Sequence, residues 1–173
     1  MSRRIGLRTM PSTGAKKPCP SGEQIVNGGF ETGDFTGWTA TGDANIISAF
    51  PSPHSGSYCV AITAPPGASG SISQTLTTPV PTACITETST FKLWIHSRYG
   101  WSPPGGGLFT AIITYTDGSQ TTVNREITVD ETNVWIEWDL KPFLEAGKTI
   151  QSIQIIIENH YTTSAVDDIS LIP

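Results

Sequence analysis

Charged side chains are scarce in this sequence, and long hydrophobic runs are absent. Asp, Glu, Lys and Arg make up only 14% of the 173 residues, whereas Gly (17) and Pro (13) are frequent. Good helix formers are few outside residues 141–148, which excludes a coiled coil or a helical bundle. No apolar run approaches the length of a membrane-spanning helix, so we expect no membrane partner. The composition instead favours many short strands joined by tight turns.

Acidic and basic residues are unevenly distributed along the chain. Residues 1–20 hold five of the ten Lys and Arg residues and no acid, so five bases face fifteen acids in residues 21–173. An acidic body cannot neutralise phosphates, which argues against nucleic acid as a partner. The basic segment is either a solvated tail or an arm that docks on the acidic body of another copy. We predict a basic N-terminal arm over residues 1–20 and one folded domain over residues 21–173.

The three cysteines, Cys19, Cys59 and Cys84, form no Cys-x-x-Cys pair. A zinc ribbon or a thioredoxin-type redox site is therefore unsupported. Three arrangements stay open at this point. Cys59 pairs with Cys84 and leaves Cys19 free, or Cys19 bridges to a cysteine of a neighbouring chain, or all three are reduced thiols.

Strand-like segments follow one another from residue 24 onward. Each is rich in β-branched and aromatic residues and ends at turn residues. Asp117-Gly118 predicts a tight hairpin turn, because both residues tolerate positive φ. Only residues 140–148 favour a short helical turn. The pattern predicts an all-β sandwich of about eight to ten antiparallel strands.

Period-two alternation in residues 91–97 separates two faces of one strand. Lys92, Trp94 and His96 share a face that we expect to be half exposed. The opposite face, Phe91, Leu93 and Ile95, is predicted to be core. In residues 134–140, one face holds Ile136, Trp138 and Leu140, opposite Trp135, Glu137 and Asp139.

Residues 25–39, IVNGGFETGDFTGWT, carry a recognisable motif. The stretch resembles the opening of carbohydrate-binding modules of the galactose-binding-like jelly-roll superfamily, where N-G-G-F-E is followed closely by G-W. The resemblance continues in order through residues 54–62, 71–78, 91–97 and 165–173. It implies a jelly-roll sandwich, but superfamily members bind sugars, bind proteins or serve as structural pieces.

The resemblance also implies a structural calcium ion. The matching ligands are the carboxylates of Glu31 and Asp167 and the backbone carbonyls of Gly29 and of residues around Ser57. Alternation of residues 165–171 independently predicts that Asp167 points inward with core residues, where a carboxylate needs a partner or a cation. The alternative is that Asp167 only accepts backbone N–H groups at a strand edge.

Sugar-binding members of the superfamily use aromatic planes that stack on pyranose rings, together with polar groups for the hydroxyls. The candidates here are Trp94, His96, Tyr99 and Trp101, with Trp135 as a weaker one. The alternative for Trp94 and Trp101 is burial against the Pro-Gly loop or a neighbouring subunit. We interpret Trp38 as core.

The chain has no recognisable catalytic arrangement. Glu137 and Asp139 share one face of a strand, but a glycosidase pair needs a cleft and usually partners from different strands. The three histidines lack metal-site spacing, and no serine lies in a nucleophile elbow. We predict a non-enzyme.

Two functions fit these observations. The first is a self-assembling structural subunit of an extracellular or spore-surface filament, linked to its neighbours through the arm. Ile5 and Leu7 alternate with Arg and Gly, which suits a strand added to the sheet edge of another copy. Residues 5–7 are too short an apolar stretch for a secretion signal, so we expect surface location without one. The alternative is a calcium-stabilised carbohydrate-binding module that binds polysaccharide.

Overall fold

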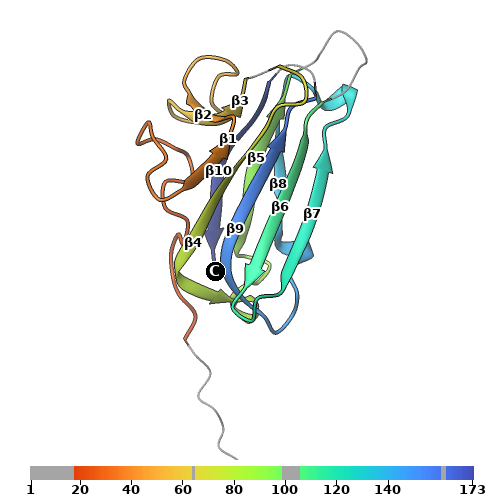
Figure 1. Cartoon of the computed structure of the whole chain (residues 1–173). Helices are drawn as coiled ribbons and strands as arrows, with labels where there is room; N and C mark the ends of the chain where they lie inside the picture. The colour runs from red at the N-terminus through yellow and green to blue at the C-terminus, as the bar shows by residue number, and fades with distance from the viewer. Residues whose placement is uncertain (1–17, 64, 99–105, 161–162) are drawn as a thin grey trace, which may run out of the picture.

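The computed structural model describes residues 18–63, 65–98, 106–160 and 163–173. In these residues, two five-stranded antiparallel sheets pack face to face (Figure 1), with strand orders β1-β4-β9-β6-β7 and β2-β3-β10-β5-β8. This architecture confirms the predicted all-β jelly-roll sandwich. The strands are β1 (Thr39–Gly42), β2 (Ala44–Ile47), β3 (Cys59–Ile62), β4 (Ser69–Pro81), β5 (Thr90–Ser97), β6 (Leu108–Tyr115), β7 (Gln120–Glu126), β8 (Trp135–Asp139), β9 (Thr149–Glu158) and β10 (Ser164–Ile172).

Three short 3₁₀ turns connect strands in the described part of the chain: η1 (Thr82–Cys84), η2 (Val129–Glu131) and η3 (Lys141–Phe143). The third lies within the segment predicted to form a helical turn. No helix among the described residues has the length and apolar character needed to cross a membrane.

The core lies between the two sheets and is built by alternation. Every second side chain of β5, of β6 and of β9 from Ile153 to Ile157 points into it, because successive residues of a strand face opposite sides. The predicted core residues of β5, Phe91, Leu93 and Ile95, are almost completely buried. Trp38 is also buried, as predicted, and its indole Nε1 donates to the Asn27 carbonyl at 3.1 Å.

The hairpin predicted at Asp117-Gly118 joins β6 to β7. Gly118 has a φ of 83°, in the left-handed region that glycine adopts without steric cost. Its N–H donates to the Tyr115 carbonyl at 2.9 Å, and the Asp117 carboxylate accepts from the Ser119 N–H at 3.0 Å. The turn therefore satisfies its own polar groups.

A bulge in β10 reverses the expected direction of one side chain. The pairing of β10 with β5 shifts between Asp167 and Ser170, and Asp168 has a φ of 45°. Before the bulge, Asp167 lies opposite Trp94 and so shares the outer face of its sheet. After it, Ile169 and Leu171 enter the core. The prediction that Asp167 points inward with these two residues is therefore wrong, because an extra residue breaks the alternation.

The cysteines pair in a way that the sequence did not indicate. Cys19 forms a disulfide with Cys84 of the same chain, with 5.6 Å between their Cα atoms, and Cys59 is a buried free thiol. The predicted pairing of Cys59 with Cys84 is therefore wrong, as are a bridge from Cys19 to a neighbouring chain and three reduced thiols. Cys59 lies in β3, on the outer face with Ala61 and Ala165.

The disulfide can be checked by counting thiols. Burial, followed by the nearby charge of Asp167, raises the pKa of the Cys59 thiol to about 12, so the thiol stays protonated and unreactive. We expect no rapid reaction with a thiol reagent at pH 8 in the native protein, one thiol in denaturant, and three after reduction. Cys59→Ala should abolish the signal in denaturant. Three thiols in unreduced protein would contradict the pairing.

Candidate functional site

A loop between β2 and β3, residues 48–58, folds over the outer face of the sheet that contains β5 and β10. We call it the cover loop. Its Ser52 carbonyl accepts from Trp135 Nε1 at 3.0 Å, and its His54 N–H donates to Asp167 Oδ2 at 2.9 Å. The face that the sequence predicted to be half exposed is thus partly covered by the chain itself.

A cavity of about 270 Å³ opens between the cover loop and the adjoining ends of β5 and β8. Trp135 forms part of its wall, and Phe50, whose side chain is 55% exposed, forms another. The Arg98 guanidinium lies over the Phe50 ring, 4.4 Å from its centre. The described residues that line it are Phe50, Pro51, Ser52, His96, Arg98, Asn133 and Trp135. The cavity combines aromatic surfaces with hydrogen-bonding groups, as small-ligand sites do.

His96 is the buried polar residue of this cavity. Its side chain is 7% exposed, and its Nδ1 atom has no hydrogen-bond partner within the part of the chain that the structure describes. Burial lowers the pKa of the imidazole, although a backbone contact with Asn133 acts in the opposite direction. The ring is therefore neutral near pH 7 and carries one acceptor nitrogen. A buried polar atom of this kind calls for a partner outside the chain, such as an ordered water or a ligand hydroxyl.

Trp94 lies beside the cavity and not in its lining. The His54 ring stacks on it with centres 3.8 Å apart and planes 15° from parallel, and the Lys92 ammonium lies 6.0 Å from its centre. The cover loop thus occupies a ring face that a sugar would need. Of the other predicted sugar-binding residues, His96 lines the cavity, whereas Tyr99 and Trp101 lie outside the described residues.

The cavity lining includes residues that the sequence analysis missed. Phe50, Arg98 and Asn133 lie on connecting segments, where alternation gives no information. Trp135 was the weaker aromatic candidate, yet it is the one that forms the wall. The one sequence feature that pointed to any of these residues was that Arg98 adjoins Tyr99, a predicted sugar-binding residue.

The outer face of the opposite sheet has a different character. Its described strands carry no aromatic side chain there, because Phe109 and Tyr115 both point into the core. Cross-strand neighbours on β6, β7 and β9 form rows of hydroxyl and amide groups with a few aliphatic side chains. These are Thr110, Ile112, Thr114, Gln120, Thr122, Asn124, Ser152, Gln154 and Ile156. This face offers no stacking platform for a pyranose ring.

Glu137 and Asp139, the two acids on one face of β8, have separate partners. Glu137 pairs with Lys92, and Asp139 Oδ1 accepts from the Lys141 N–H at 2.9 Å. These contacts support their interpretation as surface acids of an edge strand.

A cluster of acids lies under the other end of the cover loop. Asp167 is completely buried, and its carboxylate accepts from the backbone N–H groups of His54, Ser55 and Asp168 at 2.9, 3.3 and 2.8 Å. Burial, and then the neighbouring Asp168 charge, raise the pKa of Asp167 to about 7. Asp168 in turn contacts His54 Nδ1 at 2.7 Å. The desolvated Asp167 carboxylate is the kind of group that a cation stabilises.

Glu31 lies close to this cluster. Its carboxylate accepts from the backbone N–H groups of Ser57 and Tyr58 at 2.9 to 3.0 Å. A Cβ atom built on Gly29 would lie 3.0 Å from Asp168 Oδ1 and 4.0 Å from Asp167 Oδ1, whereas the Glu31 carboxylate lies against Gly56. Among the described residues, no group of three or more His, Cys, Asp and Glu side chains has a metal-binding arrangement. Carboxylate and carbonyl oxygens are the ligands that calcium takes, so Glu31 and Asp167 are the residues at which a cation can be tested.

Comparison with known proteins identifies the fold. The sequence matches no protein-family model, and no curated protein matches it. A family 61 carbohydrate-binding module, solved in complex with β-1,4-galactotriose, superposes with a TM-score of 0.61 and 22% identity, over 87% of this chain and 98% of that one. The chain therefore has the fold of a carbohydrate-binding-module-like jelly roll, as the N-terminal motif indicated.

Other solved structures share the same fold. A xylan-binding family 22 module from Paenibacillus barcinonensis superposes with a TM-score of 0.52 and 13% identity over 90% of this chain and 97% of that one. A family 16 carbohydrate-binding module superposes with a TM-score of 0.55 and 15% identity over 87% of this chain and 99% of that one. The enzymatically active domain of a bacteriophage tailspike also superposes, with a TM-score of 0.54 and 15% identity, but over only 21% of that chain.

The state of His96 predicts a pH dependence. Because its pKa is lower in the folded protein than in the unfolded chain, near 6.5, the unfolded state binds the proton first as pH falls. The titration of His96 therefore leaves the free energy of unfolding unchanged above about pH 6.5. As the pH decreases below that value, it lowers this free energy by at most about 1.4 kcal/mol per pH unit.

This dependence can be measured in two ways. NMR titration should give a His96 midpoint below 6.5, and His96→Gln should lack this part of the pH dependence of unfolding. A midpoint at or above 6.5 would show that the ring is not desolvated in solution.

Proposed function

We propose that the protein is a non-catalytic, extracellular carbohydrate-binding protein that binds one sugar unit of a glycan in the cavity formed by Phe50, His96 and Trp135. The observation that carries this proposal is the buried, unpartnered Nδ1 atom of His96 beside two aromatic side chains. Similarity in fold to carbohydrate-binding modules over nearly their whole length supports it. The disulfide supports an oxidising compartment.

The lining suits the chemistry of a sugar. Aromatic faces pack on the C–H groups of a pyranose ring, and a neutral imidazole accepts a hydrogen bond from a hydroxyl. The Trp135 ring is held in place by its bond to the Ser52 carbonyl. A volume of about 270 Å³ is slightly below the range of drug-sized ligand sites, about 300–1,000 Å³, which favours a single ring over a longer segment.

We further propose that calcium stabilises this site. Glu31 and Asp167 would supply carboxylates, and Gly29 and Ser57 would supply backbone carbonyls. A cation there would offset the charge of the buried Asp167 carboxylate, which binds two N–H groups of the cover loop. The metal would thereby hold the cover loop against β10.

Self-assembly into a filament stays a prediction. The arm residues Ile5 and Leu7, on which it depends, lie outside the described residues. Its covalent form, with Cys19 bridged to a neighbour, is incompatible with the disulfide inside the chain. Carbohydrate binding is the better supported of the two functions.

Glycan binding can be tested with two matched variants. Phe50→Ala removes an aromatic side chain from the cavity, whereas Phe143→Ala removes a similarly exposed one from the opposite end of the sandwich. We expect Phe50→Ala to weaken retention on a bound polysaccharide about tenfold, as loss of a central contact does. A glycan array that includes β-1,4-galactan and xylan would identify the ligand. No binding across the array, or equal loss in both variants, would refute the proposal.

Calcium binding can be tested by thermal unfolding. A ligand present at about a hundred times its dissociation constant stabilises the folded state by about 2.7 kcal/mol. For a domain of this size, that corresponds to a Tm decrease of roughly 5–10 °C on chelation. Asp167→Asn and Glu31→Gln should remove the sensitivity to chelator, while Glu137→Gln should retain it. Equal Tm values for calcium-loaded and chelated wild-type protein would rule out the site.

A further inference from the structure

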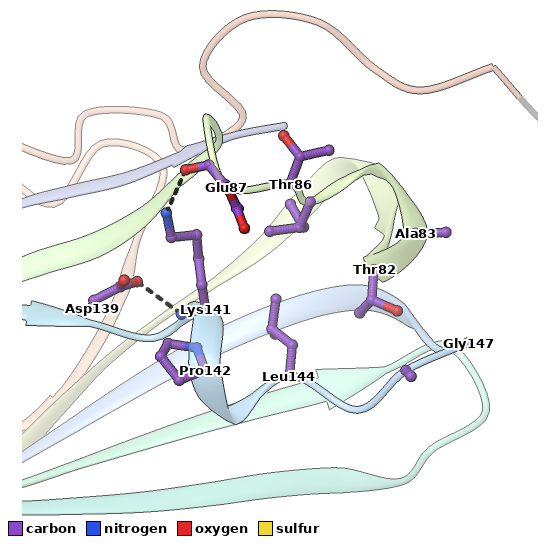
Figure 2. A pocket seen from close by; sticks show the side chains of 11 residues that line it. Thr82, Ala83, Thr86, Glu87, Asp139, Lys141, Pro142, Leu144 and Gly147 are labelled. Atoms are coloured by element: carbon purple, nitrogen blue, oxygen red, sulfur yellow. Dashed lines mark hydrogen bonds between the residues drawn. The ribbon is translucent and has the colours of Figure 1, made fainter.

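A second and larger depression lies at the other end of the sandwich. We call it the base groove; it has a volume of about 630 Å³. Figure 2 shows the two segments that form it: the residues around η1 face those around η3. The cavity beside His96 adjoins the end of β5 at Ser97. The groove adjoins the segment that leads into the start of β5 at Thr90. Its apolar lining comprises Ala83, Ile85, Pro142, Leu144 and Ala146.

Acidic side chains accompany this apolar lining. Glu87 and Asp139 are both lining residues, and Glu87 is exposed. Among the described lining residues, the one cation is Lys141, whose ammonium group donates to the Glu87 and Ser89 carbonyls at 3.3 and 2.7 Å. An apolar floor with a negative rim fits an apolar segment that carries positive charge.

The N-terminal arm begins at the edge of the base groove. Cys84, the disulfide partner of Cys19, lies between Ala83 and Ile85, which both line the groove. Residues 1–17, which precede the first described residue, therefore end two residues before Cys19, which is bonded to the edge of the groove. They carry five positive charges and no acid.

The arm carries apolar and basic residues that correspond to the apolar floor and the acidic rim of the groove. Ile5 and Leu7 are flanked by Arg4 and Arg8. In an extended chain, these two apolar side chains point to the same side, about 6.6 Å apart. The twelve residues from Leu7 to Cys19 span at most about 40 Å, and residues 11–14 (Pro-Ser-Thr-Gly) favour a turn that brings the chain back.

We propose that the base groove binds the chain's own N-terminal arm, with Ile5 and Leu7 on its apolar floor and the adjacent arginines beside Glu87 and Asp139. Because the disulfide of Cys19 holds the arm next to the groove, the chain's own arm is favoured over the arm of a second copy. A short flexible linker gives an effective concentration in the millimolar range, above that of other copies at micromolar protein. The interaction is separate from carbohydrate binding, since it involves the opposite end of the fold.

The experiment places a photoreactive residue at Leu7 of the full-length oxidised protein, in an equal mixture of ¹⁴N- and ¹⁵N-labelled chains. Mass spectrometry after irradiation should find cross-links to residues 82–87 or 139–147, with both peptides carrying the same isotope. The same probe at Ser12, in the expected turn, should give a lower yield in the groove.

Two variants test whether the groove itself is responsible. Ala83 lines the groove at an exposed position outside the core, so Ala83→Trp adds bulk there without removing core packing, and circular dichroism should show an unchanged fold. This substitution should lower the cross-link yield about tenfold. Ile5→Asp should do the same, whereas Ser12→Asp, which adds the same charge, should not.

The outcomes separate the alternatives. Same-isotope cross-links that Ala83→Trp abolishes establish the proposal. Mixed-isotope cross-links would overturn it in favour of the arm of a second copy. Absence of groove cross-links, or a yield unchanged by Ala83→Trp, would overturn it altogether.

Discussion

The carboxylate of Asp167 is the interaction on which the arrangement of the candidate site depends. It accepts two backbone N–H groups of the cover loop and so holds the loop over the outer face of one sheet. His54 then stacks on Trp94, and Ser52 reaches the indole of Trp135. These contacts hold in place the residues that form the walls of the cavity beside His96. A buried carboxylate held by N–H groups costs free energy when its partners are removed, which makes the loop position specific.

The two ends of the sandwich are organised by different chemistry. At one end, a non-covalent network of a carboxylate, aromatic rings and loop carbonyls forms a small polar cavity. At the other end, a disulfide joins the start of the described chain to η1, beside a larger apolar groove. The rigid strands between them, buried on their inner faces, separate the two sites. The proposed ligand of the cavity and the proposed segment in the groove would therefore not compete for the same residues.

Much of the fold could be predicted from local patterns, and the exceptions have physical causes. Period-two alternation identified the core face of β5, and Asp117-Gly118 identified a hairpin, because both depend on neighbouring residues only. The direction of Asp167 was mispredicted because a bulge adds one residue, and a periodic pattern does not reveal where this happens. The pairing of Cys19 with Cys84 depends on how segments 65 residues apart meet in space. Phe50 became part of the site through the path of the cover loop, and Arg98 lies directly after β5. Neither connecting segment leaves a repeating signal in the sequence.

The disulfide also determines how the protein responds to mechanical load. A force applied to the N-terminal arm passes from Cys19 directly to Cys84, so residues 20–83 are bypassed. That interval contains β1 to β4, including both of the short strands at one edge of the sandwich, β1 and β2. Under oxidising conditions the backbone of these strands therefore lies outside the covalent path of the load. Reduction of a single covalent bond would expose them to the full load.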